Sequence, residues 1–393
     1  MSHRLGHVVV VGASLAGTRA VETLRAEGYE GRVTLVGEEP CPPYDRPPLS
    51  KQLLTGDWEP PQAALGGEEH FERLDVELVL GTAASGLDRA GRAVELGDGR
   101  RLPYDAVVLA TGARARRLPG RTPPGVHTLR TLDDCLAIRA ACRTGPRVVV
   151  VGGGFIGAEV AASARAHGLD VTLVDPLPTP MARVLGTDLG RVCAELHADH
   201  GVSVRCSAGV AELRGGSRVE QVVLSDGSVI PADLVVVGVG VVPNTEWLGA
   251  SGLALRDGVL CDEHCAADEQ GRVYAAGDVA RWWRRGRSVR VEHWTNAVEQ
   301  ARHAVRNLLA GPRRGTPYDP IPYFWSDQHG VKIQMVGSPG PDDRMEVVSG
   351  SPADRRFVAV SSHAGHPTAA IAFNAPRELA RYRGLIAAAP APA

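Results

Sequence analysis

The sequence has no paired-cysteine motif, no long hydrophobic run and no excess of one charge. Its seven cysteines are an odd number and form no Cys-x-x-Cys pair, which disfavours a disulfide framework and a zinc site. The longest apolar run, 234–242, has nine residues, against the roughly 18 that cross a bilayer. The formal net charge of −2 creates no overall field that attracts nucleic acid or a membrane. We expect a cytoplasmic globular protein of two or three domains.

Glycine is abundant and gathers in two turns that follow runs of valine. The runs at 8–11 and 148–151 are typical of buried parallel strands, and helix-forming stretches follow at 18–27 and 158–167. Glycines between such elements permit a tight turn and let the backbone approach a pyrophosphate, while the helix N-terminus attracts its charge. Each turn therefore predicts a dinucleotide site.

An acidic residue follows the second strand of each unit. Glu38 lies 26 residues after Gly12, and Asp175 lies 23 residues after Gly152. A separation of about 20 places a carboxylate on a ribose hydroxyl. A strand, turn and helix without a ligand is the alternative for either motif alone, but two motifs with matched acids favour two nucleotide sites.

A second repeat, offset by 128 residues, indicates duplication. The Asp-Gly turn at 96–99 recurs at 224–227, and each copy leads through an apolar strand to a glycine, Gly112 or Gly240. This pattern predicts a hairpin and a strand whose end lets the backbone pass close to a cofactor. The sequence thus predicts an α/β protein with two nested Rossmann-like dinucleotide-binding domains.

The first copy carries an insertion. From Gly12 to Gly112 is 100 residues, but from Gly152 to Gly240 is 88. We expect the extra chain to contain 43–51, where three prolines should hold the loop extended and place Lys51 beside a cofactor ring.

Eight segments closely resemble the FAD-dependent NADH:ferredoxin reductases, which include the putidaredoxin and rhodocoxin reductases and the reductase components of aromatic-ring dioxygenases. The segments occur in order along nearly the whole chain, and the last two are more specific than any glycine turn. They are 12–17, 46–51, 110–112, 152–159, 240–245, 276–278, 291–300 and 323–328.

The resemblance implies a glutathione-reductase-like organisation with a C-terminal α+β domain. Residues 1–113 and 243–316 would form the FAD domain, 114–242 the NADH domain and 317–393 the C-terminal domain. The implied FAD contacts are Gly12, Ser14, Ala16, Gly17, Glu38, Lys51, Ala84, Thr111, Gly112, Arg130, Asp278 and Trp294. The implied NAD contacts are Gly152, Gly154, Ile156, Gly157, Glu159, Asp175, Arg183 and Gly240. Ser14 is a departure, because the stricter fingerprint has glycine there.

Several of these residues also have interpretations that need no ligand. Asp278 can accept hydrogen bonds from a polyol or cap the next segment. Asp175 favours NADH because a carboxylate repels a 2′-phosphate, whereas Arg183 either reaches the phosphate region or is a solvated surface charge. Glu159 should lie in the first turn of its helix, where the helix dipole alone would stabilise it.

The resemblance also assigns Glu159 and Lys51 a role near the flavin. It implies that Glu159 pairs with Lys51 and that together they order the nicotinamide over the flavin. The residues also predict a helix over 292–304, capped by Thr295 or Asn296; if its N-terminus points at the flavin, the helix dipole favours negative charge there. Trp294 would then pack beside the ring, or would simply be a core aromatic.

Arginines cluster around Trp282 and Trp283. They are Arg281, Arg284, Arg285, Arg287 and Arg290. Such a run is either a solvated loop or a docking patch for an acidic ferredoxin near Arg284, Arg285 and Trp294.

We therefore expect an enzyme that takes a hydride from NADH onto FAD and passes single electrons to an iron–sulfur ferredoxin. The ferredoxin would serve a haem monooxygenase or a ring-hydroxylating dioxygenase. An NADH oxidase or disulfide reductase that uses Cys41 is the alternative, and it needs an exposed thiol of lowered pKa. A flavin-bound assembly or signalling protein, similar to the mitochondrial oxidoreductase-like apoptosis factors, is a third interpretation, which the net charge disfavours.

Overall fold

The computed structural model describes residues 5–311, 314–340 and 342–388, and its chain divides into two compact units. Unit 1 comprises 1–45, 64–114 and 242–322. Unit 2 comprises 46–63, 115–241 and 323–393. Each unit contains one of the two predicted glycine turns.

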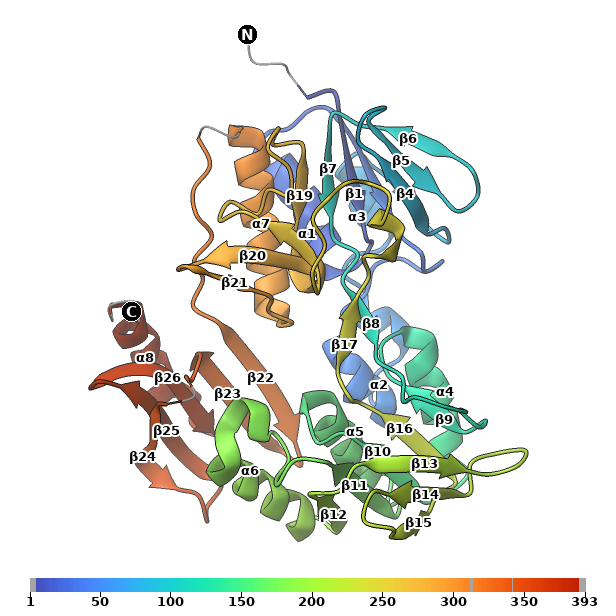
Figure 1. The fold of residues 1–393 in the computed structure, drawn as a ribbon, viewed down its shortest axis with the longest axis vertical. Coiled ribbons are helices and arrows are strands. Elements are labelled where there is room, and N and C mark those ends of the chain that lie inside the picture. Colours follow the sequence, from blue (N-terminus) through green and yellow to red (C-terminus); the bar gives the residue numbers. More distant parts are fainter. Residues whose placement is uncertain (1–4, 312–313, 341, 389–393) are drawn as a thin grey trace. The chain divides into compact units, whose positions relative to one another are not determined.

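Unit 1 is built on a five-stranded parallel sheet (Figure 1). The central strands β1 (His7–Val11) and β7 (Ala106–Leu109) are buried on both faces, which is why they are almost uninterrupted runs of apolar residues. Helices α1 (Leu15–Ala26) and α7 (Trp294–Ala310) pack against each other and against this sheet. The sheet order is β19 (Val273–Ala275), β7 (Ala106–Leu109), β1 (His7–Val11), β2 (Arg32–Val36), β3 (Val76–Val79).

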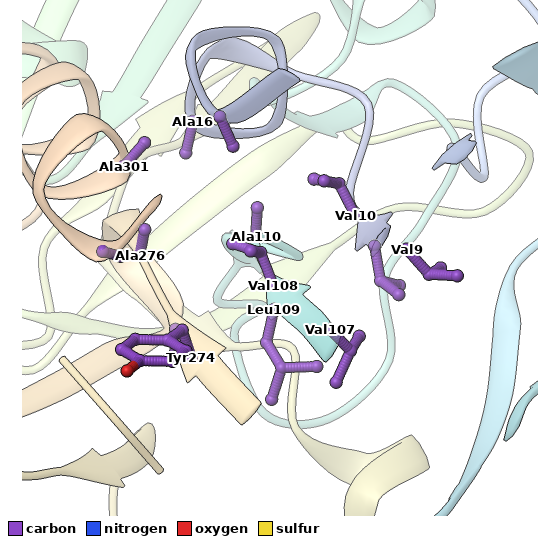
Figure 2. Close-up of a cluster of buried hydrophobic side chains, with 14 of the residues drawn as sticks. Val9, Val10, Ala16, Val107, Val108, Leu109, Ala110, Tyr274, Ala276 and Ala301 are labelled. Carbon is purple, nitrogen blue, oxygen red and sulfur yellow. The ribbon is translucent and has the colours of Figure 1, made fainter. Parts of the chain in front are cut away.

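The core of unit 1 lies between this sheet and the two helices. Figure 2 shows side chains of β1, β7 and β19 gathered with Ala16 of α1 and Ala301 of α7. The small residues at these helix positions let both helices approach the strands closely. Unit 1 also contains two small sheets and a short helix. The first sheet is β4 (Ala84–Asp88), β5 (Ala93–Leu96) and β6 (Arg101–Pro103), the second is β18 (Val259–Cys261), β20 (Ala280–Arg284) and β21 (Arg287–Val289), and the helix is α3 (Glu68–Arg73).

Unit 2 repeats the same parallel sheet. Its strands follow the order β12 (Val202–Cys206), β11 (Val171–Asp175), β10 (Val148–Val151), β16 (Leu234–Val237), β9 (Val126–Thr128). Helix α5 (Phe155–Ala166) packs on β10 and β11 as α1 packs on β1 and β2. The predicted hairpin also recurs: β14 (Gln221–Leu224) pairs with β15 (Val229–Pro231) across the 224–227 turn, as β5 pairs with β6. Strand β13 (Val210–Arg214) completes that second small sheet.

The C-terminal part of unit 2 is a five-stranded antiparallel sheet with one helix. Its strands follow the order β22 (Tyr323–Gln328), β23 (Val331–Gly337), β26 (His366–Phe373), β25 (Arg356–His363), β24 (Arg344–Ser351), and the helix is α8 (Pro376–Ala388). This sheet shares one hydrophobic core with helix α6 (Ala182–Asp199), in which Leu185 and Leu189 meet Phe324 and Ile333. The predicted fold class, two Rossmann-like units with an α+β region, is confirmed.

The domain boundaries differ from the expected ones at the insertion. Residues 46–63 belong to unit 2 although 1–113 were expected to form one segment. The reason is that the insertion forms helix α2 (Gln52–Thr55), which packs on α4 (Leu132–Cys142) and α5. Assigning FAD to unit 1 and NADH to the sheet of unit 2 stays a prediction.

Local structure departs from expectation in three further places. The 43–51 loop is not extended: Pro47 and Pro48 open a 3-10 helix over Pro47–Ser50, because proline's fixed φ also suits the first helical positions. Helices α1 and α5 begin three residues before the expected starts, so that the last glycine of each turn lies inside the helix. Helix α7 begins at Trp294, with His293 and not Thr295 or Asn296 as its N-cap.

The described residues contain neither a membrane-spanning helix nor a metal-binding cluster. No helix there combines the length and the apolar character needed to cross a bilayer. Nor do three His, Cys, Asp or Glu side chains gather there in a way that would hold a metal ion.

Candidate functional site: two dinucleotide cradles and a buried ion pair

The first cradle lies where β1 turns into α1. Gly12 has φ +120°, and a Cβ there would stand 2.1 Å from the carbonyl oxygen of Ala110. A Cβ on Gly17 would stand 1.9 Å from the carbonyl oxygen of Gly12. Both positions therefore require glycine, because strand, turn and helix are in backbone contact. The end of β7 closes this turn through a 2.7 Å hydrogen bond from the Ala110 N–H to the carbonyl oxygen of Val11.

The start of α7 meets the start of α1 at Gly277. A Cβ on Gly277 would stand 3.2 Å from Cβ of Ala16 and 3.7 Å from Cβ of Ala297. The Gly277 N–H donates to Oε1 of Gln300 at 2.9 Å, which fixes the turn that carries Asp278. The N-termini of α1 and α7, each of which carries a partial positive charge, thus flank the segment 277–279. This arrangement fits a pyrophosphate.

The other FAD positions predicted in unit 1 lie at the ends of strands and helices. Glu38 is exposed after β2, and Ala84 begins β4. Thr111 and Gly112 follow β7, where the Thr111 hydroxyl donates to the carbonyl oxygen of Asn244 at 2.9 Å. Trp294 is half-buried, and its Nε1 donates to Oδ1 of Asp45 at 2.7 Å.

Lys51 and Arg130, also predicted to contact FAD, belong to unit 2. The Arg130 N–H donates to Asp134 at 2.9 Å, beside the capping box that begins α4. The Arg130 carbonyl oxygen accepts a hydrogen bond from the Arg46 guanidinium, which joins the insertion to this turn.

The second cradle reproduces the first. Gly152 has φ +104°, and a Cβ there would stand 2.3 Å from the carbonyl oxygen of Gly238. A Cβ on Gly157 would stand 1.8 Å from the carbonyl oxygen of Gly152. Gly154, the N-cap of α5, differs because a Cβ there would meet nothing within 4 Å. Gly152 thus permits the tight turn, Gly154 leaves the backbone open to a ligand, and Gly157 lets the helix pack closely on the strand.

Asp175 has a structural role that the sequence did not reveal. Its Oδ2 accepts from the Gly153 N–H at 2.6 Å, and its Oδ1 accepts from the Leu177 N–H at 2.7 Å. The carboxylate therefore shapes the glycine turn, and its remaining lone pairs are free to accept a ribose hydroxyl. Ile156, Arg183 and Gly240 complete the predicted NAD set: Ile156 is 44% exposed, Arg183 is exposed in the first turn of α6, and Gly240 has φ +94°.

Lys51 and Glu159 meet as the resemblance implies. Lys51 Nζ lies 2.7 Å from Glu159 Oε2, and the Glu159 side chain is 3% exposed. The position of Glu159 differs from expectation, however. It is the fifth residue of α5 and lies in the second turn, so the helix dipole is a weaker explanation for a carboxylate there than its direct partners are.

Three donors on Glu159 were not assigned a role from the sequence. The Ser50 hydroxyl donates to Oε2 at 2.5 Å, the Ser326 hydroxyl donates to Oε1 at 2.7 Å, and the Asp327 N–H lies 3.4 Å from Oε1. All lie within the two segments 46–51 and 323–328 that carry the resemblance, and this was the only signal that pointed to them.

Nearby carboxylates neutralise part of the arginine cluster. Arg284 and Arg285 share Asp319 at 2.7 and 2.8 Å. Asp257 accepts from Arg281 at 2.6 Å and pairs with Arg290 at 3.2 Å. The interpretation of this run as solvated loop is wrong for Arg284, whose side chain is 11% exposed and whose pKa is lowered by burial.

Five of the seven cysteines are buried as small apolar residues, as expected. Burial raises the pKa of Cys135 and of Cys142 to about 11 and that of Cys193 to about 12, so these thiols are protonated and unreactive. Cys41 and Cys206 are half-buried, and burial raises the pKa of Cys206 to about 11.

Comparison with known proteins decides the family. Residues 6–301 match the family described as Pyridine nucleotide-disulphide oxidoreductase, and residues 323–393 match the one described as Reductase C-terminal. The sequence is 40% identical to rhodocoxin reductase of Rhodococcus erythropolis over 88% of this chain and 81% of that protein. The chain belongs to the FAD-dependent NADH:ferredoxin reductase family.

Two other members of the family match nearly the whole length of this chain. The ferredoxin–NAD(+) reductase component of the biphenyl dioxygenase system of Paraburkholderia xenovorans is 39% identical over 94% of this chain and 90% of its own. The putidaredoxin reductase in the crystal structure of its covalent complex with putidaredoxin superposes with a TM-score of 0.91. That comparison covers 97% of this chain and 93% of the other, at 35% identity.

Membership in this family implies FAD and NADH as cofactors, and the residues present fit them. Each cradle holds a glycine whose Cβ would collide with backbone, beside a helix N-terminus. In the second cradle the open side of Gly154 leaves room for a pyrophosphate.

Proposed function

We propose that this protein is a flavoprotein reductase that passes electrons from NADH through FAD to a small iron–sulfur ferredoxin, which in turn serves a haem monooxygenase or a ring-hydroxylating dioxygenase. The observation that carries the proposal is the pair of matched cradles, one per unit, in a chain that resembles ferredoxin reductases over almost its full length. FAD supplies the conversion of a two-electron hydride into single electrons.

The proposal gives each cradle a ligand. The first would hold FAD at Gly12, Ser14, Ala16 and Gly17, with Asp278 at the flavin's polyol side. The second would hold NADH at Gly152, Gly154 and Gly157, with Asp175 on the adenosine ribose. In this proposal Lys51 and Glu159 orient the nicotinamide, so that catalysis comes from positioning and exclusion of water and not from an acid–base pair.

Nucleotide choice follows from Asp175. Its carboxylate accepts two backbone N–H groups, which fixes it at the end of β11. A fixed negative charge there repels the 2′-phosphate of NADPH and accepts the 2′-hydroxyl of NADH. We therefore propose NADH as the physiological donor.

The experiment that tests the function is rapid mixing under anaerobic conditions. The purified holoprotein is mixed with NADH, and flavin absorbance is followed before and after addition of candidate two-iron ferredoxins. The expected result is fast bleaching by NADH and reoxidation by at least one ferredoxin. A protein that does not take up FAD, or whose flavin NADH does not bleach, contradicts the proposal.

For the ferredoxin contact we propose the face of unit 1 that carries Arg284, Arg285 and Trp294. Arg284 and Thr295 line one small cavity, which places β20 beside the start of α7. Two arginines share the single charge of Asp319, so this trio keeps one positive charge for an acidic partner. Trp283, 50% exposed, adds apolar surface on the same strand.

A charge reversal tests this face. Arg285→Glu should raise the KM for ferredoxin by about tenfold at low ionic strength, with less effect in high salt. Arg73→Glu, an exposed arginine on α3, is the matched control. If both variants raise the KM for ferredoxin equally, the contact lies elsewhere. The NADH–ferricyanide activity, which needs no ferredoxin, should be the same in both variants.

We also propose that the protein works in the cytoplasm. No cysteine among the described residues is disulfide-bonded, which suits a reducing compartment.

A further inference from the structure

The Glu159 carboxylate is held at both oxygens by groups from two separate segments of unit 2. Lys51 and Ser50, from the insertion, contact Oε2 at 2.7 and 2.5 Å. Ser326, on strand β22, donates to Oε1 at 2.7 Å. The chain thus assigns one carboxylate oxygen to the insertion and the other to the C-terminal sheet.

A second hydrogen bond holds each of the two serines in place. The Ser50 carbonyl oxygen accepts the Ser163 hydroxyl at 2.7 Å, one helical turn beyond Glu159 on α5. The Ser326 oxygen accepts from Nε2 of Gln328 at 3.1 Å. Ser50, Ser326 and Gln328 are all 1% exposed or less.

The bond from Gln328 sets the direction of the Ser326 hydroxyl. An amide N–H can only donate, so the Ser326 oxygen is the acceptor in that bond. Its own hydrogen is then directed to the other partner, Glu159 Oε1. Because the Glu159 side chain is only 3% exposed, loss of this donor would leave Oε1 with a single long contact, from the Asp327 N–H at 3.4 Å.

We propose that Ser326, oriented by Gln328, is a positioning residue of the reductase reaction. It holds Oε1 of Glu159 so that Oε2 stays aligned with Lys51, and it thereby fixes the ion pair that orients the nicotinamide. The C-terminal sheet then contributes to hydride transfer from NADH. This inference rests on the proposed function, because the pair has no substrate to orient otherwise.

A misplaced ion pair should affect the rate more than the affinity. The binding energy of NADH comes mainly from its phosphates and riboses at the second cradle, whereas hydride transfer depends on the alignment of the reacting atoms. Loss of one hydrogen bond to a charged group corresponds to a factor of about ten.

The test is anaerobic stopped-flow reduction of the holoprotein by NADH without ferredoxin. Ser326→Ala should lower the limiting rate of flavin reduction by about tenfold and change the Kd for NADH by less than about threefold. It should also weaken the long-wavelength charge-transfer absorbance between reduced flavin and NAD+. Ser326→Thr keeps the hydroxyl and should restore the limiting rate and the charge-transfer absorbance. Gln328→Met removes only the orienting donor and should produce a smaller loss in the same direction.

Ser361→Ala is the matched control. Ser361 is equally buried, in strand β25 of the same sheet, and its hydroxyl donates to Asp343. A limiting rate in Ser326→Ala equal to that in Ser361→Ala, or a Ser326→Thr variant as slow as Ser326→Ala, overturns the proposal. If Ser326→Ala does not retain FAD, Gln328→Met decides the question by the same measurements. Wild-type flavin that NADH fails to bleach contradicts the proposed function itself and not this inference.

Discussion

Gly154 offers a substitution that separates ligand binding from folding. Its φ of −75° and ψ of −174° lie in a region open to every residue, and a Cβ there would contact nothing within 4 Å. Gly154→Ala should therefore change the free energy of unfolding by less than about 0.5 kcal/mol. The methyl group would, however, stand on the open side of the turn, where we place the NADH pyrophosphate.

The size of the binding defect follows from the hydrogen bonds that the methyl group would displace. One backbone N–H bond to a charged phosphate contributes about 1.5–3 kcal/mol. Loss of one such bond raises the Kd for NADH by about 10- to 150-fold. The Kd is measured from the concentration dependence of anaerobic flavin reduction, and stability from urea unfolding of the same preparation.

Gly157→Ala is the control for this experiment. Its Cβ would stand 1.8 Å from the Gly152 carbonyl oxygen, so helix α5 must move off the strand. This variant should lose about 1–3 kcal/mol of stability. An unchanged Kd in Gly154→Ala would refute the placement of NADH in the second cradle, and loss of FAD from that variant would show that the two cradles hold the opposite ligands.

Three further outcomes are expected. Asp175→Ala should lower kcat/KM for NADH about tenfold or more and reduce the ratio of NADH to NADPH activity, because both the ribose acceptor and the anchor of the turn are lost; an unchanged ratio would contradict the assigned role. Burial lowers the pKa of His197 to about 4, so this residue's contribution to stability is intact above about pH 6.5 and is lost as the pH falls from 6.5 towards 4. Over that pH range the free energy of unfolding of His197→Gln, measured with denaturant, should rise with pH less steeply than that of wild type, by about 1.4 kcal/mol per pH unit. An equal slope in both proteins would refute burial of His197 as the cause. Cys41→Ser should keep ferredoxin-dependent cytochrome c reduction within about twofold of wild type, whereas a disulfide reductase would lose its activity.

The parts of the fold that local sequence determines were predictable. The valine runs of β1 and β10, the glycines after them and the Asp-Gly hairpins each encode a short-range geometry, and all form as expected. The helical conformation of the Pro47–Pro48 segment was not predictable, because proline's φ suits both an extended chain and the first turn of a helix. Burial of Leu49, Leu53 and Leu54 accompanies the helical alternative.

The surroundings of Glu159 were the least predictable. Its partners lie 108 to 168 residues away in sequence, and no periodicity or spacing links a serine in one segment to a glutamate in another. The same is true of Asp319, whose pairing with Arg284 and Arg285 turned an apparent surface charge run into a half-neutralised cluster. Tertiary contacts of this kind appear only once the strands and helices are assembled.

The alternation of the chain between the two units has a consequence for biosynthesis. The chain passes from one unit to the other five times, and every strand of the parallel sheet in unit 2 has been synthesised by residue 237. Strand β19 and helix α7 of unit 1 are made later. A nascent chain that stops at residue 241 thus has a complete second sheet but leaves β7 as an exposed edge strand, a surface that invites aggregation. Expression of either unit by simple truncation should therefore fail, and a chaperone that shields β7 during translation should raise the yield of the full-length enzyme.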